Sequence, residues 1–180
     1  DYFTAAQGII KAAQAAGITS GSAAGAYAGL PAVAYWENIF PAAAGSGLTA
    51  IAAMRAGAAR VLAADIDALA LAAIDLNAAA NAVAVEATGE DLLVELPDDV
   101  KGRFDVVLVG DLFYERSLAD RVLTFIEAAS AHGADILVGD PRRSYFPKER
   151  FRQVMEYAVP VTRELEDAEI KHAAVWRLTA

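Results

Sequence analysis

An acid and a phenol follow the most apolar run in this chain. Residues 106–110 read Val-Val-Leu-Val-Gly, Asp111 comes next, and Tyr114 lies three positions further on. If a turn of helix begins here, the two side chains project from one face. A carboxylate can bind and aim a charged amine, and a phenol can accept a hydrogen bond and offer its ring face to a cation. The alternative is that Asp111 caps a helix and Tyr114 packs in the core.

The run before Asp111 favours the functional interpretation. An unbroken apolar run of this kind is typical of a strand buried on both faces, in a parallel sheet covered by helices. In such sheets, ligands bind outside the carboxyl ends of the strands. We therefore expect Asp111 and Tyr114 to face a binding cleft.

Three upstream motifs could bind a nucleotide-like ligand. Gly45-Ser46-Gly47 precedes a helix-like segment, where glycines allow close approach and the helix offers free N–H groups, although an ordinary tight turn explains the motif equally well. Asp65 follows about twenty residues later, at a strand end, where a carboxylate can accept hydrogen bonds from ribose hydroxyls. Asp67 is better explained as a helix cap. Asp91 could accept a hydrogen bond from an adenine amino group, or belong to a solvated acidic loop.

Several other polar and aromatic residues have plainer explanations. We expect structural roles for Asn77 and Asn81, the latter at a helix end. A basic group after the Asp140-Pro141 turn could contact an acidic partner, but solvation is the simpler explanation for its members Arg142, Arg143 and Lys148. Aromatic residues near position 36 could line a pocket, while Phe40 is expected in the core.

Strands and helices alternate from residue 41 onward. This order predicts an α/β fold, a Rossmann-like doubly wound and mostly parallel sheet with an antiparallel C-terminal strand pair. Residues 1–40 form an Ala/Gly-rich segment, with a helix expected over 4–16 and a loop over 20–29, and residues 41–180 form the main domain. We expect strands over 35–40, 60–64, 83–87, 104–109, 135–138, 161–165 and 173–178, and helices over 48–58, 68–80, 118–131 and 149–157.

Composition excludes several classes of function. The 180 residues carry a formal charge of −9 and contain no cysteine, and the isoelectric point is about 4.6. An acidic domain repels phosphate backbones, so we expect no nucleic-acid partner. His132 and His172 lie far apart without metal-ligand spacing, so we expect no metal. The uncharged stretch 12–36 is built from small residues and broken by Pro31, so we expect no membrane span, and we expect a cytoplasmic monomer.

The motifs come in an order that resembles the class I S-adenosylmethionine-dependent methyltransferases. They are Ala43–Leu48, Ala63–Asp67, Asn77–Asn81, Gly89–Leu93 and Gly110–Glu115. The Asp-Leu-Phe-Tyr-Glu run, together with Thr162–Asp167 and Val175–Leu178, narrows this resemblance to one group within the class. The chain is similar over about residues 42–180 to the electron transfer flavoprotein β-subunit lysine methyltransferases, relatives of the ribosomal protein L11 methyltransferase.

This resemblance implies a protein-lysine N-methyltransferase that uses S-adenosylmethionine, with the flavoprotein β subunit as its protein substrate. It implies that Asp111 and Tyr114 face the target lysine. It also implies cofactor-binding residues, namely Gly45, Ser46, Gly47, Asp65, Ile66, Asp91, Leu92 and Asp111. The substrate-binding residues that it implies are Trp36, Phe113 and Glu115.

Two other functions remain open from the residues. A nucleotide-binding oxidoreductase of Rossmann type would use the same topology, although the glycine loop has Ala50 where a third glycine is expected. A non-catalytic methyltransferase-like binding protein is the other alternative. Its support is that Ile39-Phe40-Pro41 stands where the family has Val-Leu-Asp, so that an acid is missing.

Overall fold

The protein is described by a computed structural model that covers residues 33–36, 46–93, 104–160 and 170–179. Its strands are β1 (Val33–Trp36), β2 (Val61–Ala64), β3 (Glu86–Thr88), β4 (Val106–Gly110), β5 (Asp135–Asp140), β6 (Phe151–Pro160) and β7 (Ile170–Leu178). Its helices are α2 (Leu48–Arg55), α3 (Ala68–Ala80), α4 (Arg116–Ala131) and the short 3-10 helix η1 (Lys148–Arg150).

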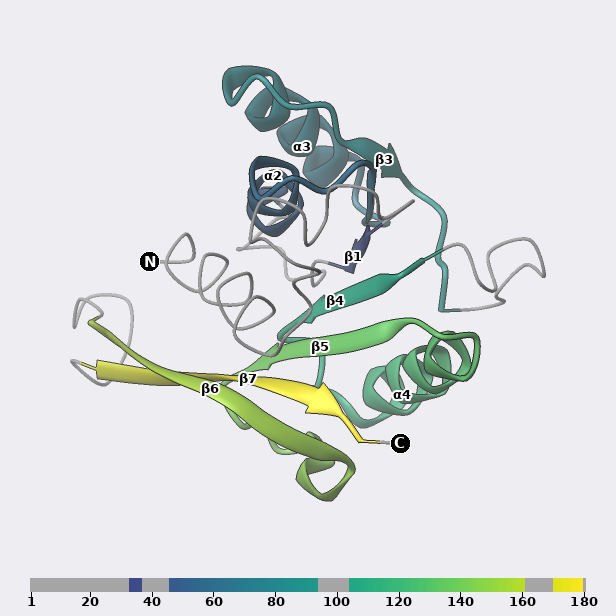
Figure 1. Ribbon diagram of the computed structural model, residues 1–180, viewed down its shortest axis with the longest axis vertical. Coiled ribbons are helices and arrows are strands. Elements are labelled where there is room, and N and C mark those ends of the chain that lie inside the picture. Colours follow the sequence, from purple (N-terminus) through teal and green to yellow (C-terminus); the bar gives the residue numbers. More distant parts are fainter. Residues whose placement is uncertain (1–32, 37–45, 94–103, 161–169, 180) are drawn as a thin grey trace.

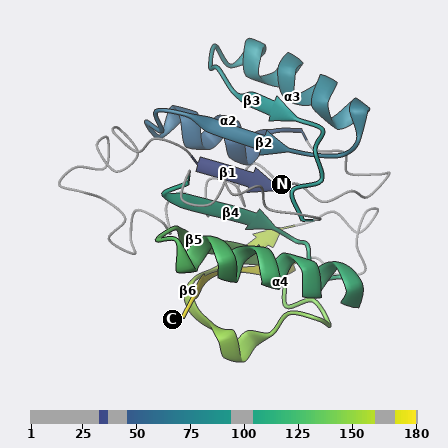
Figure 2. The ribbon, with the colours of Figure 1, turned by 90° about the vertical axis from the view of Figure 1, so that its right-hand side faces the viewer.

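These strands form one sheet in the order β3-β2-β1-β4-β5-β7-β6. The first five in that order run parallel, and β7 pairs antiparallel with both β5 and β6. Figure 2 shows β3, β2, β1, β4 and β5 following one another across the sheet. The architecture is the predicted doubly wound α/β sheet with an antiparallel C-terminal pair, which confirms the expected fold class.

Helices cover both faces of the sheet. The side chains of β4 show this, because successive residues pack against helices on opposite faces. Val106 and Leu108 pack in one cluster with α2 and α3, whereas Val107 and Val109 pack in the other with α4. Figure 1 shows α2 and α4 on opposite sides of the strands. Because both faces of β4 are buried, its sequence is apolar at every position before Gly110, as expected for a central parallel strand.

Local sequence explains where the helices begin. Asp67 is the N-cap of α3, and its carboxylate accepts a hydrogen bond from the Leu69 N–H at 2.9 Å, as predicted. Gly47 precedes α2 with a φ of +70°, and a Cβ there would lie 3.1 Å from Ile74 of α3. A glycine is therefore required for both the backbone conformation and the close packing against α3.

The expected helix over 149–157 is wrong, because these residues form η1 and most of β6. Strand β6 pairs with β7 from Phe151↔Leu178 to Pro160↔Ile170, with a bulge between Gln153 and Met155. The expected partner of β7, residues 161–165, lies outside the described residues, and the observed partner is β6.

Strand β1 comes from the N-terminal segment that the sequence sets apart, yet it lies between β2 and β4 in the sheet. It occupies Val33–Trp36, so it overlaps the expected strand at two positions. The expected helix over 4–16, the loop over 20–29 and residues 37–41 lie outside the described residues. Within the described part of the chain, no helix is long and apolar enough to cross a membrane.

Candidate functional site

The carboxyl ends of the parallel strands place four acids or polar turns at one edge of the sheet. Asp65 follows β2, residues 89–91 follow β3, Asp111 follows β4, and Asp140 ends β5. The register places Trp36, the last residue of β1, beside Ala64 and Val109. Strand order reverses around β1 and β4, so this edge is the topological switch point, where ligands of doubly wound sheets bind.

Asp65 is buried and only half satisfied. Its Oδ1 accepts a hydrogen bond from the Asp67 N–H at 2.9 Å, while Oδ2 is buried without a hydrogen-bond partner among the described residues. Burial raises the pKa of Asp65, and the Asp67 N–H partly offsets that effect. A buried acceptor at a strand end needs a donor beyond those among the described residues, and a ribose hydroxyl is a group that could supply it.

The turn before α2 is fixed by α3. The Asn77 side-chain amide donates to the Ser46 carbonyl at 2.8 Å, which gives Asn77 the structural role expected for it. Gly47, held close to Ile74, leads directly into the N-terminus of α2. Gly45 lies outside the described residues. The turn is therefore positioned by packing against α3, and its approach to a cofactor stays a prediction.

Asp91 has protein partners on both of its oxygens. Oδ1 accepts from the Leu93 N–H at 3.0 Å, and Oδ2 pairs with Arg121 at 2.6 Å. An adenine amino group would therefore share this carboxylate with Arg121. Ile66 is an exposed apolar side chain next to Asp65, as a residue that packs against a planar ring would be, whereas Leu92 is buried in the core.

Asp111 forms a two-point ion pair with Arg143 at this edge. Its backbone has a φ of +53° and donates from N–H to the Gly139 carbonyl at 2.8 Å. Its carboxylate accepts two hydrogen bonds from Arg143, from Nε to Oδ1 at 2.7 Å and from Nη2 to Oδ2 at 2.6 Å. A non-glycine residue in the left-handed region marks a site where the surroundings hold the backbone in place.

The residues after Asp111 differ in exposure. Phe113 is 0% exposed and its ring packs edge-on against Phe146 at 5.2 Å, so it supports the site from the core and does not face a substrate. The prediction of Phe113 as a substrate contact is corrected accordingly. Tyr114 is half-buried against the same cluster. Glu115 is exposed, is the N-cap residue of α4, and accepts a hydrogen bond from Ser117.

Asp140 is a buried acid of this edge that sequence reasoning missed. It is 1% exposed, its Oδ1 accepts from the Arg143 N–H at 2.7 Å, and Oδ2 has no partner among the described residues. Burial raises the pKa of Asp140 to about 6, with Arg143 and Arg142 N–H groups opposing and the Asp111 charge reinforcing the shift. Its sequence signal is a repeat, because Val-Gly-Asp occurs at the end of both strands, with Asp111 directly after β4 and Asp140 as the last residue of β5, and Gly110 pairs with Gly139.

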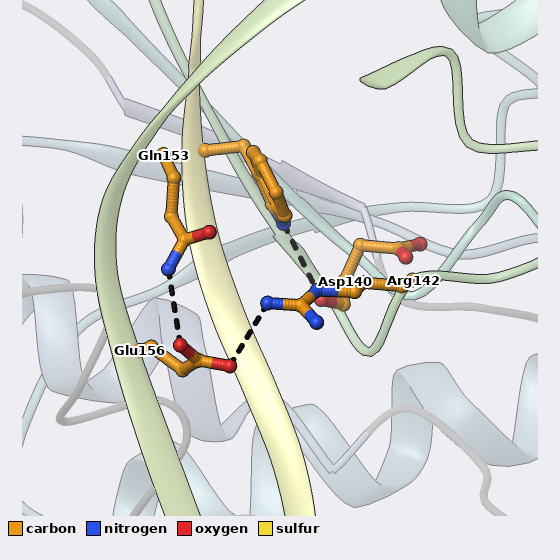
Figure 3. A network of polar contacts seen from close by, with 5 residues as sticks. Asp140, Arg142, Gln153 and Glu156 are labelled. Carbon is orange, nitrogen blue, oxygen red and sulfur yellow. Dashed lines mark hydrogen bonds and ion pairs between the residues drawn. The ribbon is translucent and has the colours of Figure 1, made fainter.

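The members of the basic group after β5 are exposed, as expected for solvated side chains, and each also makes a specific contact within the chain. Arg143 pairs with Asp111, and Arg142 pairs with Glu156 of β6 at 3.0 Å. Figure 3 shows Arg142 reaching toward Glu156, which also accepts from Gln153. The Lys148 ammonium lies 5.9 Å from the centre of the Trp176 ring.

Replacing Asp140 tests whether this acid is held in an unfavourable charged state. A pKa raised from 3.8 to about 6 means that the folded protein binds a proton more tightly than the unfolded chain. The group therefore stabilises the fold fully below pH 4, and this contribution is lost as the pH rises through 6. The wild type should therefore lose about 2 kcal/mol of unfolding free energy through this group between pH 4 and 7, and Asp140→Asn should not show this loss.

Urea unfolding of both proteins at several pH values measures this difference. Any fixed cost of the new amide cancels when each protein is compared with itself across pH. Parallel pH dependences in the wild type and Asp140→Asn would contradict the assignment.

No metal cluster occurs in the described ranges, since no three His, Cys, Asp or Glu side chains gather there. The edge instead combines two acids, Asp65 and Asp140, whose buried oxygens have no partner among the described residues, with two arginine-paired acids, Asp91 and Asp111, around the switch point of the sheet. A family model described as ribosomal protein L11 methyltransferase (PrmA) matches residues 33–135, from β1 to the start of β5.

The chain belongs to the ribosomal protein L11 methyltransferase (PrmA) family. Curated relatives include the mouse electron transfer flavoprotein beta subunit lysine methyltransferase, 34% identical over 151 residues, which are 81% of this chain and 58% of the relative. The human protein of the same name is 30% identical, over 81% of this chain and 56% of its own length. The chain thus spans a little over half the length of the curated relatives it matches.

Solved structures agree with the family at the level of the fold. A ribosomal protein L11 methylase from Lactobacillus delbrueckii is 21% identical with a TM-score of 0.53, covering 93% of this chain and 77% of that chain. The class I methyltransferase architecture, and with it the resemblance predicted from the motifs, is confirmed for this member of the L11 methyltransferase family.

Proposed function

We propose that the protein is an S-adenosylmethionine-dependent protein-lysine N-methyltransferase whose substrate is the β subunit of electron transfer flavoprotein. The observation that carries the proposal is Asp111, held at the carboxyl end of β4 on the same edge as the buried acid Asp65. The names of the curated relatives support the substrate class. Membership of the L11 methyltransferase family supports the methyl donor.

The residues present fit the cofactor. Asp65 has a buried oxygen without a partner among the described residues, as a ribose-binding carboxylate needs. Ile66 offers an exposed apolar surface beside it, and Asp91 can accept from an amino group while it holds Arg121. Ser46 and Gly47 lead into the N-terminus of α2, where free N–H groups favour a carboxylate.

Asp65→Asn is expected to weaken S-adenosylmethionine binding by about 30-fold. The amide keeps the shape of the side chain, but it replaces one charged acceptor by a donor, and a hydrogen bond to a charged group contributes about 2 kcal/mol. Calorimetric titration of the purified variants measures the change. Asp67→Asn is the matched control, because it removes a charge two residues away and Asn still caps α3. Equal affinities in the two variants would exclude Asp65 from the cofactor site.

On the substrate side, Asp111 and Tyr114 receive the lysine. When bound, the cofactor would supply a methyl group on a sulfonium, and the new bond from the lysine nitrogen to the methyl carbon would form as the S–C bond breaks and leaves its electron pair on sulfur. An ammonium has no lone pair, so the lysine must lose a proton to water before transfer. Asp111 aims the amine, and the Tyr114 ring and hydroxyl contact it. Alignment of nitrogen, carbon and sulfur supplies most of the rate.

Transfer of a labelled methyl group tests the proposal directly. The chain is incubated with labelled S-adenosylmethionine and, separately, with the flavoprotein β subunit and with ribosomal protein L11. Label on a lysine of the flavoprotein subunit is the expected result. Label only on the ribosomal protein would indicate that ribosomal protein L11, and not the flavoprotein subunit, is the substrate. Binding of a nicotinamide dinucleotide without S-adenosylmethionine binding would favour the oxidoreductase alternative. If no protein is labelled and no cofactor binds, the proposed enzymatic activity is contradicted.

A further inference from the structure

The acid assigned to the substrate lysine already carries a counter-charge. Both oxygens of Asp111 accept hydrogen bonds from Arg143, at 2.7 Å and 2.6 Å. The pair is neither buried nor fully solvated, with the two side chains 39% and 40% exposed. A two-point contact between a planar guanidinium and a carboxylate fixes orientation as well as distance.

The fold builds this pair from two separate loops. The Arg143 N–H is fixed to the buried Asp140 carboxylate at 2.7 Å. The loop after β5 is tied to the loop after β4 by a hydrogen bond from the Tyr145 N–H to the Phe113 carbonyl at 3.3 Å. Arg143 therefore starts from an anchored backbone and meets a carboxylate whose own backbone is anchored, unlike two long side chains that meet on a surface.

The counter-charge changes what Asp111 does to a nearby amine. A bare carboxylate favours the protonated form of a neighbouring lysine and raises its pKa, and the protonated form cannot accept a methyl group. A carboxylate balanced by a guanidinium holds the ammonium less strongly. Each oxygen still has a second lone pair that can accept an N–H from the amine. The ion pair can therefore aim the lysine without keeping it charged.

We infer that Arg143 is a positioning residue that orients Asp111 and lowers the pH at which the bound substrate lysine becomes reactive. This inference rests on the lysine methyltransferase activity proposed above. It assigns a role in the reaction to a residue that lies beyond the part of the chain matched by the family model.

Several other charged groups of these loops, among the described residues, have contacts of their own. Arg142 is paired with Glu156 of β6, and Arg116 of α4 lies 5.4 Å from the centre of the Tyr145 ring. Glu115 accepts from Ser117, and Lys148 lies over Trp176 of β7. Asp140 titrates near pH 6, which is below the range in which a lysine loses its proton. The alkaline side of a pH–rate profile therefore lies above the titration of Asp140 and includes that of the lysine.

The test is the pH dependence of single-turnover methyl transfer to the flavoprotein β subunit, from pH 6 to 10. Arg143→Gln is expected to move the rising limb upward by about one pH unit, so that the rate falls about tenfold near neutral pH and approaches the wild-type rate at high pH. Arg143→Lys, which keeps a cation, is expected to bring the rising limb most of the way back to its wild-type pH. Arg142→Gln is the matched control from the same turn and is expected to keep the wild-type profile.

Two results would overturn the inference. One is an Arg143→Gln profile that keeps the wild-type midpoint, whether the rate is unchanged or is lowered equally at every pH. The other is an equal shift in Arg142→Gln, which would indicate a general charge effect. Both require an active wild-type enzyme. A wild type that transfers no methyl group to the flavoprotein subunit contradicts the proposed function itself, and the two failures are thereby distinguished.

Discussion

Asp111→Asn is expected to lower the turnover rate of methyl transfer by about 10³-fold, while S-adenosylmethionine still binds. A loss of this size corresponds to about 4 kcal/mol of the activation barrier, which is within what alignment of reactants can supply. Asparagine tolerates the left-handed backbone of Asp111, whose φ is +53°. The substitution therefore removes the charge and the two-point contact with Arg143 without forcing the turn to change.

The measurement pairs methyl transfer to the flavoprotein β subunit with calorimetric titration of the cofactor. Asp120→Asn is the control, since it removes one negative charge from an exposed position of α4. Asp111→Ala should also be inactive, with an added cost in stability from the strained backbone. Turnover of Asp111→Asn above a tenth of the wild-type value would exclude Asp111 as the residue that aims the lysine.

Trp176→Ala is expected to have the largest effect on stability, a loss of about 4 kcal/mol in unfolding free energy. Trp176 is 1% exposed near the C-terminal end of β7, its ring lies 5.1 Å from that of Phe146, and it is among the largest fully buried side chains. Its Nε1–H donates to the Asp140 carbonyl at 3.5 Å. Removing the indole leaves a cavity directly beneath the loop that carries Asp140 and Arg143.

Urea unfolding monitored by circular dichroism measures this change. Trp176→Phe fills most of the volume and should lose much less stability, mainly from the missing hydrogen bond. Tyr145→Ala is the exposure control, because its ring is 41% exposed and its loss should cost under about 1 kcal/mol. If Trp176→Ala unfolds like Tyr145→Ala, the packing described around β7 is incorrect.

The parts of the fold that the sequence predicted well are those specified by local signals. Helix α3 was expected over its observed bounds, because Asp67 caps it and Asn81 ends it. Strand β4 was expected because burial on both faces makes its sequence continuously apolar. Asp65 and Asp111 could be placed at strand ends for the same reason.

Strand β6 could not be predicted because the bulge gives its buried side chains a spacing that resembles that of a helix. The least exposed of its described side chains are Phe151, Val154, Met155 and Tyr157. The bulge between Gln153 and Met155 shifts the strict alternation of a strand, so that residues 151, 154 and 155 follow a spacing of three and four. The pairing with β7 decides the structure, and that information lies elsewhere in the chain.

The arginine at the site was missed for a related reason. Arg143 and Asp111 are 32 positions apart, and their contact depends on the alignment of β4 with β5. A local view of Asp140-Pro141-Arg142-Arg143 shows only a basic turn. The Val-Gly-Asp that occurs at the end of both strands places both acids at strand ends. Only the register of β4 with β5 shows that these two ends lie side by side.

The position of β7 between β5 and β6 has a consequence for synthesis of the chain. Strand β6 emerges from the ribosome before β7, yet it has no pairing partner in the sheet until residues 170–178 follow it. Until then the edge of β5 stays open to wrong partners. Because Trp176 arrives with β7, the loop that presents Arg143 to Asp111 gains its support only after residues 170–178 have been made. A partly made chain can thus possess the strand that precedes Asp65 while the loop that carries Arg143 still lacks its support.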